Sequence, residues 1–147
     1  MYKRLLVPVD GSELSKRAAD ESLALAKQLG GVVVGFVAEA LPPLPSSGAA
    51  LANYQQQVNE HDAKTEAHAN KVLARFGEMA NEVGVPFEPH YDRDDDVAGA
   101  IARAAEVKAC DLIVMVTHGR GTFGELLFGS QTKNVMARCK LPLLVLH

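Results

Sequence analysis

Five short apolar stretches alternate with segments of helical pattern, and this alternation constrains the fold more than any other feature of the sequence. The apolar stretches are Leu5–Val9, Val32–Ala38, Phe87–Tyr91, Leu112–Val116 and Leu141–His147. Short unbroken apolar runs are typical of strands buried on both faces of a parallel sheet. Strands separated by helices form β-α-β units with right-handed crossovers. The sequence therefore predicts an α/β fold, a parallel sheet with helices on both faces.

Helical segments lie between these strands, and the first two of them end at glycine. They are predicted at Glu13–Leu29, at about Ala49–Val83, at Val97–Val107 and from Ser130 onward. In the first segment, the residues at helical spacing that we expect to face the sheet are Leu14, Ala18, Leu25 and Leu29. Pro89 removes a backbone donor from the third strand, so we expect that strand at an edge of the sheet.

Length and charge limit the class of protein. A chain of 147 residues fits a single domain, residues 1–147. The net charge of -3 argues against nucleic acid as a partner. No apolar stretch is long enough for a membrane span, and the N-terminal run is too short for a signal peptide. Cys110 and Cys139 show no paired spacing and are interpreted as free thiols, so we expect a cytoplasmic protein.

The stretch Asp111–Gln131 has the arrangement of a phosphate-binding site. The strand Leu112–Val116 is followed by a loop that contains Gly119, Gly121 and Gly124, and Ser130 then opens a helix as its candidate N-cap. Backbone N–H groups of a glycine-rich loop can point at an anion, and the helix dipole adds positive charge. The alternative interpretation is a plain connection on the surface of an α/β fold.

A second loop is expected beside this one. In an open parallel sheet the ligand binds at the carboxyl ends of the strands, where the strand order reverses. Asp10-Gly11-Ser12, after the first strand, and His118–Ser130, after the fourth, then become neighbours. A carboxylate next to a phosphate-binding loop suits contact with a ribose or with a metal ion.

Four segments together carry a resemblance to a known family. They are Leu5–Ser12, Ala109–Arg120, Leu126–Val135 and Leu141–Leu146. The chain resembles the universal stress protein family in these segments and along its whole length. The resemblance implies a five-stranded parallel sheet in the order 3-2-1-4-5, of the Rossmann-like or flavodoxin-like kind. It also implies a homodimer formed through the last strand, Leu143–Leu146, which is an apolar edge that invites pairing.

The ATP-binding branch of that family carries Gly-x-x-Gly, nine residues, and then Gly followed by Ser or Thr. Gly119, Gly129 and Ser130 fit this pattern, but Val116 stands in place of the first glycine. A valine favours extended backbone, so its side chain is expected either in the packing of the sheet or towards the ligand. The nucleotide contacts implied by the resemblance are Pro8, Val9, Asp10, Val37, Met115, Val116, Gly119, Arg120, Gly129, Ser130, Gln131 and Thr132.

The resemblance also assigns roles to these positions. Asp10 would contact the ribose or a phosphate-bound Mg²⁺, and Val37, placed after the second strand, would meet the adenine with its backbone. The N–H groups at Gly119, Gly129, Ser130 and Gln131 would hold the phosphates of ATP. Arg120 is interpreted either as a phosphate clamp or as a solvated loop residue.

No further metal site or catalytic residue is expected. His61 and His68 are seven residues apart, whereas a helical metal pair is normally four apart, so they are assigned to a solvated face. Asp92, Asp94, Asp95 and Asp96 precede a helix and are interpreted as capping residues. His118 has no nucleophile with an orienting acid beside it, so no base is assigned.

Three functions remain open from the sequence. The first is a cytoplasmic, dimeric stress-response protein that binds ATP, hydrolyses it slowly at most, and acts as a sensor or regulator. The second is a dimeric interaction module of the same fold without nucleotide, which Val116 favours. The third is an ATP-using adenylate-transfer enzyme. Such enzymes usually carry a serine-rich phosphate-binding loop after the first strand. The loop at that place here, Asp10-Gly11-Ser12-Glu13, is not of that kind.

Overall fold

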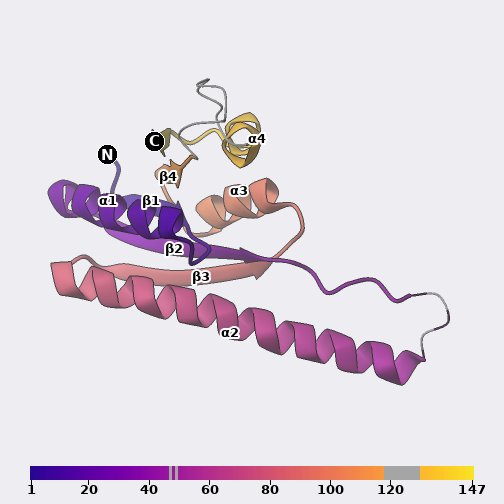
Figure 1. The fold of residues 1–147 in the computed structure, drawn as a ribbon. Helices are drawn as coiled ribbons and strands as arrows, with labels where there is room; N and C mark the ends of the chain where they lie inside the picture. The colour runs from indigo at the N-terminus through magenta and orange to yellow at the C-terminus, as the bar shows by residue number, and fades with distance from the viewer. Residues whose placement is uncertain (47, 49, 118–129) are drawn as a thin grey trace.

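The computed structural model describes residues 1–46, 48, 50–117 and 130–147. Within these residues, five parallel strands form one sheet in the order β3-β2-β1-β4-β5 (Figure 1). The strands are β1 (Arg4–Pro8), β2 (Val32–Glu39), β3 (Phe87–Arg93), β4 (Leu112–Val116) and β5 (Leu143–Leu146). The helices are α1 (Glu13–Leu29), α2 (Leu51–Val83), α3 (Val97–Val107) and α4 (Ser130–Arg138). The α/β fold and its strand order are as predicted.

Several element boundaries differ from the sequence prediction. Strands β2 and β3 both run further than expected, because Ala38 pairs with Asp92 and Glu39 with Arg93. Strand β5 is shorter than the apolar run that contains it. The predicted edge position of β3 is confirmed, and Pro89 lies exposed within that strand.

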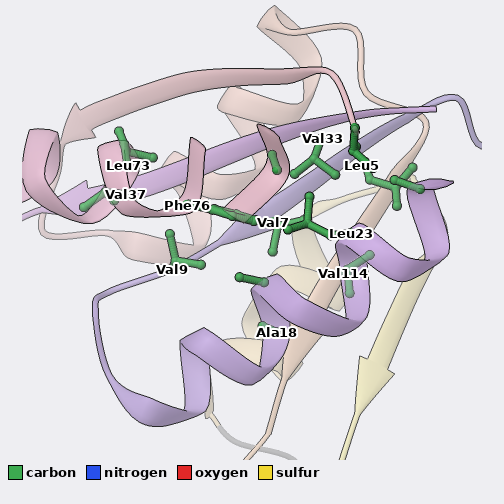
Figure 2. Close-up of a cluster of buried hydrophobic side chains, with 14 of the residues drawn as sticks. Leu5, Val7, Val9, Ala18, Leu23, Val33, Val37, Leu73, Phe76 and Val114 are labelled. Carbon is green, nitrogen blue, oxygen red and sulfur yellow. The ribbon is translucent and has the colours of Figure 1, made fainter. Parts of the chain in front are cut away.

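Alternate side chains of the strands enter two separate cores. Leu5 and Val7 of β1 face α1 and α2, in a cluster that also holds Leu73 and Phe76 of α2 (Figure 2). Leu6 faces the opposite way, into a second cluster formed with α3 and α4. This alternation follows from the two-residue repeat of a strand, and it explains why consecutive residues of the central strands β1, β2 and β4 are buried.

Helix α1 buries smaller residues than the sequence pattern indicated. Ser12 caps the helix by accepting a hydrogen bond from the Ser15 N–H, and Gly30 ends it in a left-handed conformation with φ 61°. The buried residues are Ala18, Ala19, Ser22, Leu23 and Ala26. Of the four predicted inward residues, only Ala18 is fully buried, and the three leucines lie partly buried at the margins of the contact. The prediction was therefore incomplete, because Leu25 and Leu29 do pack against the core while most of the fully buried positions hold small residues.

Helix α2 extends well past the sheet at its N-terminal end (Figure 1). Two histidines on this helix contact the segment that leaves β2. The Nε2 atom of His61 lies 2.9 Å from the Ala40 carbonyl oxygen, and the Nδ1 atom of His68 lies 2.5 Å from Oε1 of Glu39. Their role in the structure is therefore to tie α2 to the end of β2.

The acidic segment before α3 forms caps and ion pairs. Asp96 caps α3 by accepting a hydrogen bond from the Gly99 N–H at 3.2 Å, and Asp94 accepts one from the Asp96 N–H at 2.8 Å. Asp94 also pairs with Arg103, and Asp96 pairs with Arg138 at the end of α4. The capping interpretation is confirmed for Asp96, whereas Asp95 accepts a hydrogen bond from the Leu41 N–H instead, and the pair of Asp96 with Arg138 joins α4 to α3.

Glu88 on β3 links three elements at the amino end of the sheet. Its carboxylate lies 2.7 Å from the Arg4 guanidinium and 2.7 Å from the Lys108 ammonium. Hydrogen bonds from Lys108 and Arg4 lower the pKa of Glu88 below its usual value of 4.5. A lowered pKa in the folded state stabilises the fold above the unfolded-state pKa, and this stabilisation is lost as the pH falls through the folded-state pKa.

We expect Glu88→Gln to cost about 0.5–1 kcal/mol at pH 7, because the ion pairs are part-exposed and screened by solvent. The difference between the two proteins should shrink as the pH falls below the usual value of 4.5 and through the lowered pKa of Glu88, because the native carboxyl then also becomes protonated. Urea unfolding of both forms at several pH values measures this. Glu82→Gln, at an exposed position of α2, is the control. An equal loss at acid and neutral pH would contradict the ion-pair explanation.

Candidate functional site

A cleft of about 430 Å³ opens at the carboxyl ends of β1, β2 and β4. We call it the switch-point cleft, because the chain leaves β1 for one face of the sheet and β4 for the other. Among the predicted contacts, those that line it are Pro8, Val9, Asp10, Met115, Val116, Ser130, Gln131 and Thr132. The structure thus brings together residues from the two loops that the sequence placed side by side.

The loop between β1 and α1 forms a compact hydrogen-bonded turn. The carboxylate of Asp10 accepts a hydrogen bond from the Ser12 N–H at 2.9 Å, and Ser15 Oγ accepts one from the Gly11 N–H at 3.1 Å. Burial raises the pKa of Asp10, but hydrogen bonds from Ser12 and Ser15 outweigh it and hold the pKa below its usual value. Asp10 is therefore a fixed negative charge at the mouth of the switch-point cleft.

The N-terminal end of α4 forms the opposite wall. Ser130 and Gln131 are exposed, whereas Thr132 is only 2% exposed and anchors the first turn. Ser130 was predicted as the N-cap, but it is the first residue of the helix. The first turn of a helix has N–H groups without partners inside the helix and carries partial positive charge. This wall therefore suits an anion.

The floor of the switch-point cleft is apolar. It includes Phe36 and Ala38 of β2, Ile101 of α3 and Met115 of β4. Such a surface can take a flat apolar group while the cleft mouth holds polar ones.

Val37 lies inside β2, which runs on to Glu39, and not after the strand as the resemblance implied. Its side chain is 1% exposed and is buried in the core against α1 and α2, on the other face from Phe36 and Ala38. Only the backbone of Val37 is left for a contact at this end of the sheet.

Val116 is the last residue of β4, paired with Leu146 of β5. Its side chain is half-buried and packs against the same core as Leu112 and Val114. The residue also lines the switch-point cleft. The extended backbone agrees with the sequence prediction, and the residue takes part both in the packing of the sheet and in the lining of the cleft.

Three other predicted contacts, Gly119, Arg120 and Gly129, lie outside the described residues, as does His118. Sequence reasoning also missed several residues of the switch-point cleft. They are Ser12, Leu14, Ser15, Ala18, Phe36, Ala38, Val97, Ile101 and Thr117. The two-residue repeat of β2 could have indicated Phe36 and Ala38, because these residues flank Val37 and face the other way.

Metal-binding side chains do not gather in the part of the chain that the structure describes. No group of three or more His, Cys, Asp or Glu side chains is placed there to hold a metal ion. Cys110 and Cys139 are free, and burial raises the pKa of the Cys110 thiol to about 11, so it stays protonated. Within the same residues, no helix combines the length and apolar character that a membrane crossing requires.

The sheet order and the cleft at its switch point define a class of α/β proteins that bind ligands between the ends of β1 and β4. A sequence model of the universal stress protein family matches residues 1–147. The chain belongs to the universal stress protein family.

Two relatives are similar over nearly the whole chain. A universal stress protein of Thermus aquaticus, in the QAH/OAS sulfhydrylase 3′ region, is 32% identical over 155 residues, covering 100% of both chains. A universal stress protein of Methanocaldococcus jannaschii is 30% identical over 149 residues, covering 99% of this chain and 82% of that protein.

Solved structures share the fold. A universal stress protein in complex with cAMP superimposes with a TM-score of 0.71 at 23% identity, covering 99% of this chain and 97% of that one. The universal stress protein of Archaeoglobus fulgidus in complex with dAMP has a TM-score of 0.68 at 18% identity, covering 99% and 98%.

Proposed function

We propose that this protein is a cytoplasmic stress-response protein that binds an adenine nucleotide, ATP in the first place, in the switch-point cleft and acts as a sensor or regulator. One observation carries the proposal. The switch-point cleft joins a fixed carboxylate at Asp10, an apolar floor and the N-terminal end of α4. These three surfaces match the ribose, the base and the phosphates of a nucleotide.

Each surface has its own part in binding. Asp10 contacts the ribose, or a Mg²⁺ ion bound to the phosphates, since its lowered pKa keeps it ionised. The N–H groups at Ser130 and Gln131, together with Gly119, Arg120 and Gly129 of the family pattern, hold the phosphates. The adenine lies over the apolar floor and meets the backbone of Val37. The complexes of two proteins of the same fold, one with cAMP and one with dAMP, support adenine as the base of the proposed ligand.

Titration calorimetry with ATP, with and without Mg²⁺, tests the proposal. We expect binding in the micromolar range or above, and a rise in melting temperature with added ATP. Native mass spectrometry of the purified protein adds the stoichiometry and shows any retained ligand. No heat signal and no thermal shift at millimolar ATP would overturn the proposal.

The second candidate function is a dimeric interaction module without nucleotide. Val116 favours it, because the side chain at the cleft replaces a glycine of the ATP-binding pattern. We expect Val116→Gly to bind ATP more tightly than the native protein, by up to about tenfold, since two methyl groups leave the cleft. The same titration on both forms measures this. Weaker binding by the glycine variant would show that Val116 supports the site through the packing of β4.

The open edge of β5 supports the dimer that we propose. The Ile113 N–H donates to the Pro142 carbonyl at 3.0 Å, and the Thr117 N–H donates to the Leu146 carbonyl at 2.9 Å. Backbone groups of even-numbered residues therefore face β4, and those of Leu143 and Val145 face away from the sheet. These outward-facing N–H and C=O groups on the apolar edge strand β5 suit pairing with the same strand of a second copy.

We expect Val145→Pro to raise the dissociation constant of this dimer by more than about tenfold, because proline removes an outward N–H from each copy and its ring obstructs pairing. Hydrogen bonds to β4 remain, so the melting temperature of the dilute monomer should change little. Sedimentation or light scattering across a concentration series measures the effect. Leu144→Ala, on the same strand, is a control that keeps every backbone donor. A native protein that stays monomeric at micromolar concentration would contradict the dimer.

A further inference from the structure

A second cleft, of about 420 Å³, lies on the other side of the β1–α1 loop, between α1 and α2. We call it the interhelical cleft. From α1 it is lined by Ser12, Lys16 and Ala19, and from α2 by a stripe that includes Lys71, Arg75 and Met79. These residues are spaced at one turn along each helix, so the interhelical cleft follows the groove between the two helices.

Positive charge gathers on the walls of this cleft. Lys71 and Arg75 are four residues apart on α2, so their like charges lie on one face and repel, and Lys16 faces them from α1. Within the described part of the chain, none of the three forms a salt bridge. Two carboxylates also line the cleft, Asp10 and Glu13, both at the α1 end. The α2 end therefore keeps an excess of positive charge.

The floor of the interhelical cleft is apolar. Val9 at the end of β1 and Phe76 of α2 are core residues at its base, where Figure 2 shows them close together. Val72 and Met79 of α2 complete this floor. The Nδ1 atom of His68 faces Glu39, so the other ring nitrogen is left towards the Gly11 turn, where an added Cβ would lie 3.9 Å from it.

We propose that the interhelical cleft binds a small organic anion, a carboxylate or phosphate monoester carried on an apolar group. The apolar part rests on Phe76 and Met79, and the anionic head lies between Lys16, Lys71 and Arg75. Such a ligand relieves the repulsion between Lys71 and Arg75 and covers the apolar floor. The site is separate from the switch-point cleft, although the two share the β1–α1 loop.

Nuclear magnetic resonance of the full chain with ¹⁵N label tests the proposal, with phenyl phosphate, phenylacetate and neutral benzyl alcohol as probes. We expect at least one of the two anions to shift the amide signals of Lys71–Met79 and to bind at least about tenfold more tightly than the alcohol, since the charged contacts are part of the affinity. Shifts with phenyl phosphate alone would assign the phosphate monoester, and shifts with phenylacetate would assign the carboxylate.

A pair of double variants with equal charge completes the test. Lys71→Gln with Arg75→Gln should raise the dissociation constant of the anion by about tenfold, since two charged contacts are lost. Lys27→Gln with Lys64→Gln, at exposed positions outside the cleft, should leave it unchanged. The proposal is overturned by no binding of either anion, by equal binding of benzyl alcohol, by equal loss in both variants, or by shifts confined to Ile101 and Thr132 of the switch-point cleft.

Discussion

Replacing Gly35 with leucine is expected to destabilise the fold by about 3 kcal/mol, at the upper end of the range for overpacking a filled core. Gly35 lies in the middle of β2, paired with Val7 on one side and Pro89 on the other. A Cβ atom there would lie 2.7 Å from two ring carbons of Phe87 and 2.9 Å from Cδ1 of Phe76. Contacts this short force something to move.

Neither ring has room to withdraw freely. Phe76 and Phe87 pack on each other in a tilted arrangement, with ring centroids 4.9 Å apart, so displacing one disturbs the other. Phe76 also joins α2 to the core, and it is 2% exposed. The strain therefore reaches the contact between the longest helix and the sheet.

Urea unfolding followed by circular dichroism measures the loss. Gly35→Ala gives a graded comparison and should cost about 1–2 kcal/mol, since only one carbon is added. Ala74→Leu adds a larger side chain on the exposed face of α2 and should change stability by less than about 0.5 kcal/mol. A Gly35→Leu protein as stable as the native one would show that the rings can rearrange at little cost.

Ser130→Asp is expected to weaken ATP binding by about ten- to a hundredfold, because it places a negative charge where the proposed phosphates bind. Ser130 is exposed at the first position of α4 and lines the switch-point cleft. An acidic residue in the first turn favours the helix dipole, so α4 itself should not be destabilised. Loss of binding would then come from repulsion of the ligand.

Ser130→Asn is the matched control, since asparagine has the same shape as aspartate without its charge. We expect its ATP affinity to fall by less than about threefold, because only a hydroxyl contact changes. Titration calorimetry at several salt concentrations compares both variants, and the aspartate effect should shrink as salt screens the charge. Equal affinities for the two variants would place the phosphates elsewhere.

The alternation of apolar runs and helices was enough to predict the α/β class and the parallel sheet, whereas the strand order came from the resemblance to the family. It also placed the β1–α1 loop beside the start of α4, since the ends of parallel strands meet at one edge. The inward face of α1 was harder to predict. Alanines, a serine and a single leucine, Leu23, make that contact, and small residues give a weak periodic signal compared with leucine.

The residues that line the two clefts are placed by contacts between elements, which the pattern of one segment does not show. The resemblance placed Val37 after the second strand, although the apolar run Val32–Ala38 already included it, and the strand runs on until Glu39 pairs with Arg93. Val97 and Ile101 line the switch-point cleft from α3, and the position of α3 over β2 is set by tertiary packing. The interhelical cleft likewise depends on how Lys16 of α1 and Arg75 of α2 meet across a groove, which neither helix indicates by itself.

The central position of β1 sets an order of assembly during synthesis. Its neighbour β2 follows directly, but its other neighbour, β4, is far away in the chain, as the bond from the Lys3 N–H to Asp111 across 108 residues illustrates. At ribosomal rates of roughly 5–20 residues per second, β4 is synthesised on the order of ten seconds after β1. During this interval β1, α1, β2, α2 and β3 can already pair and pack. One edge of β1 stays open on the nascent chain, where it is the part most in need of protection by a chaperone.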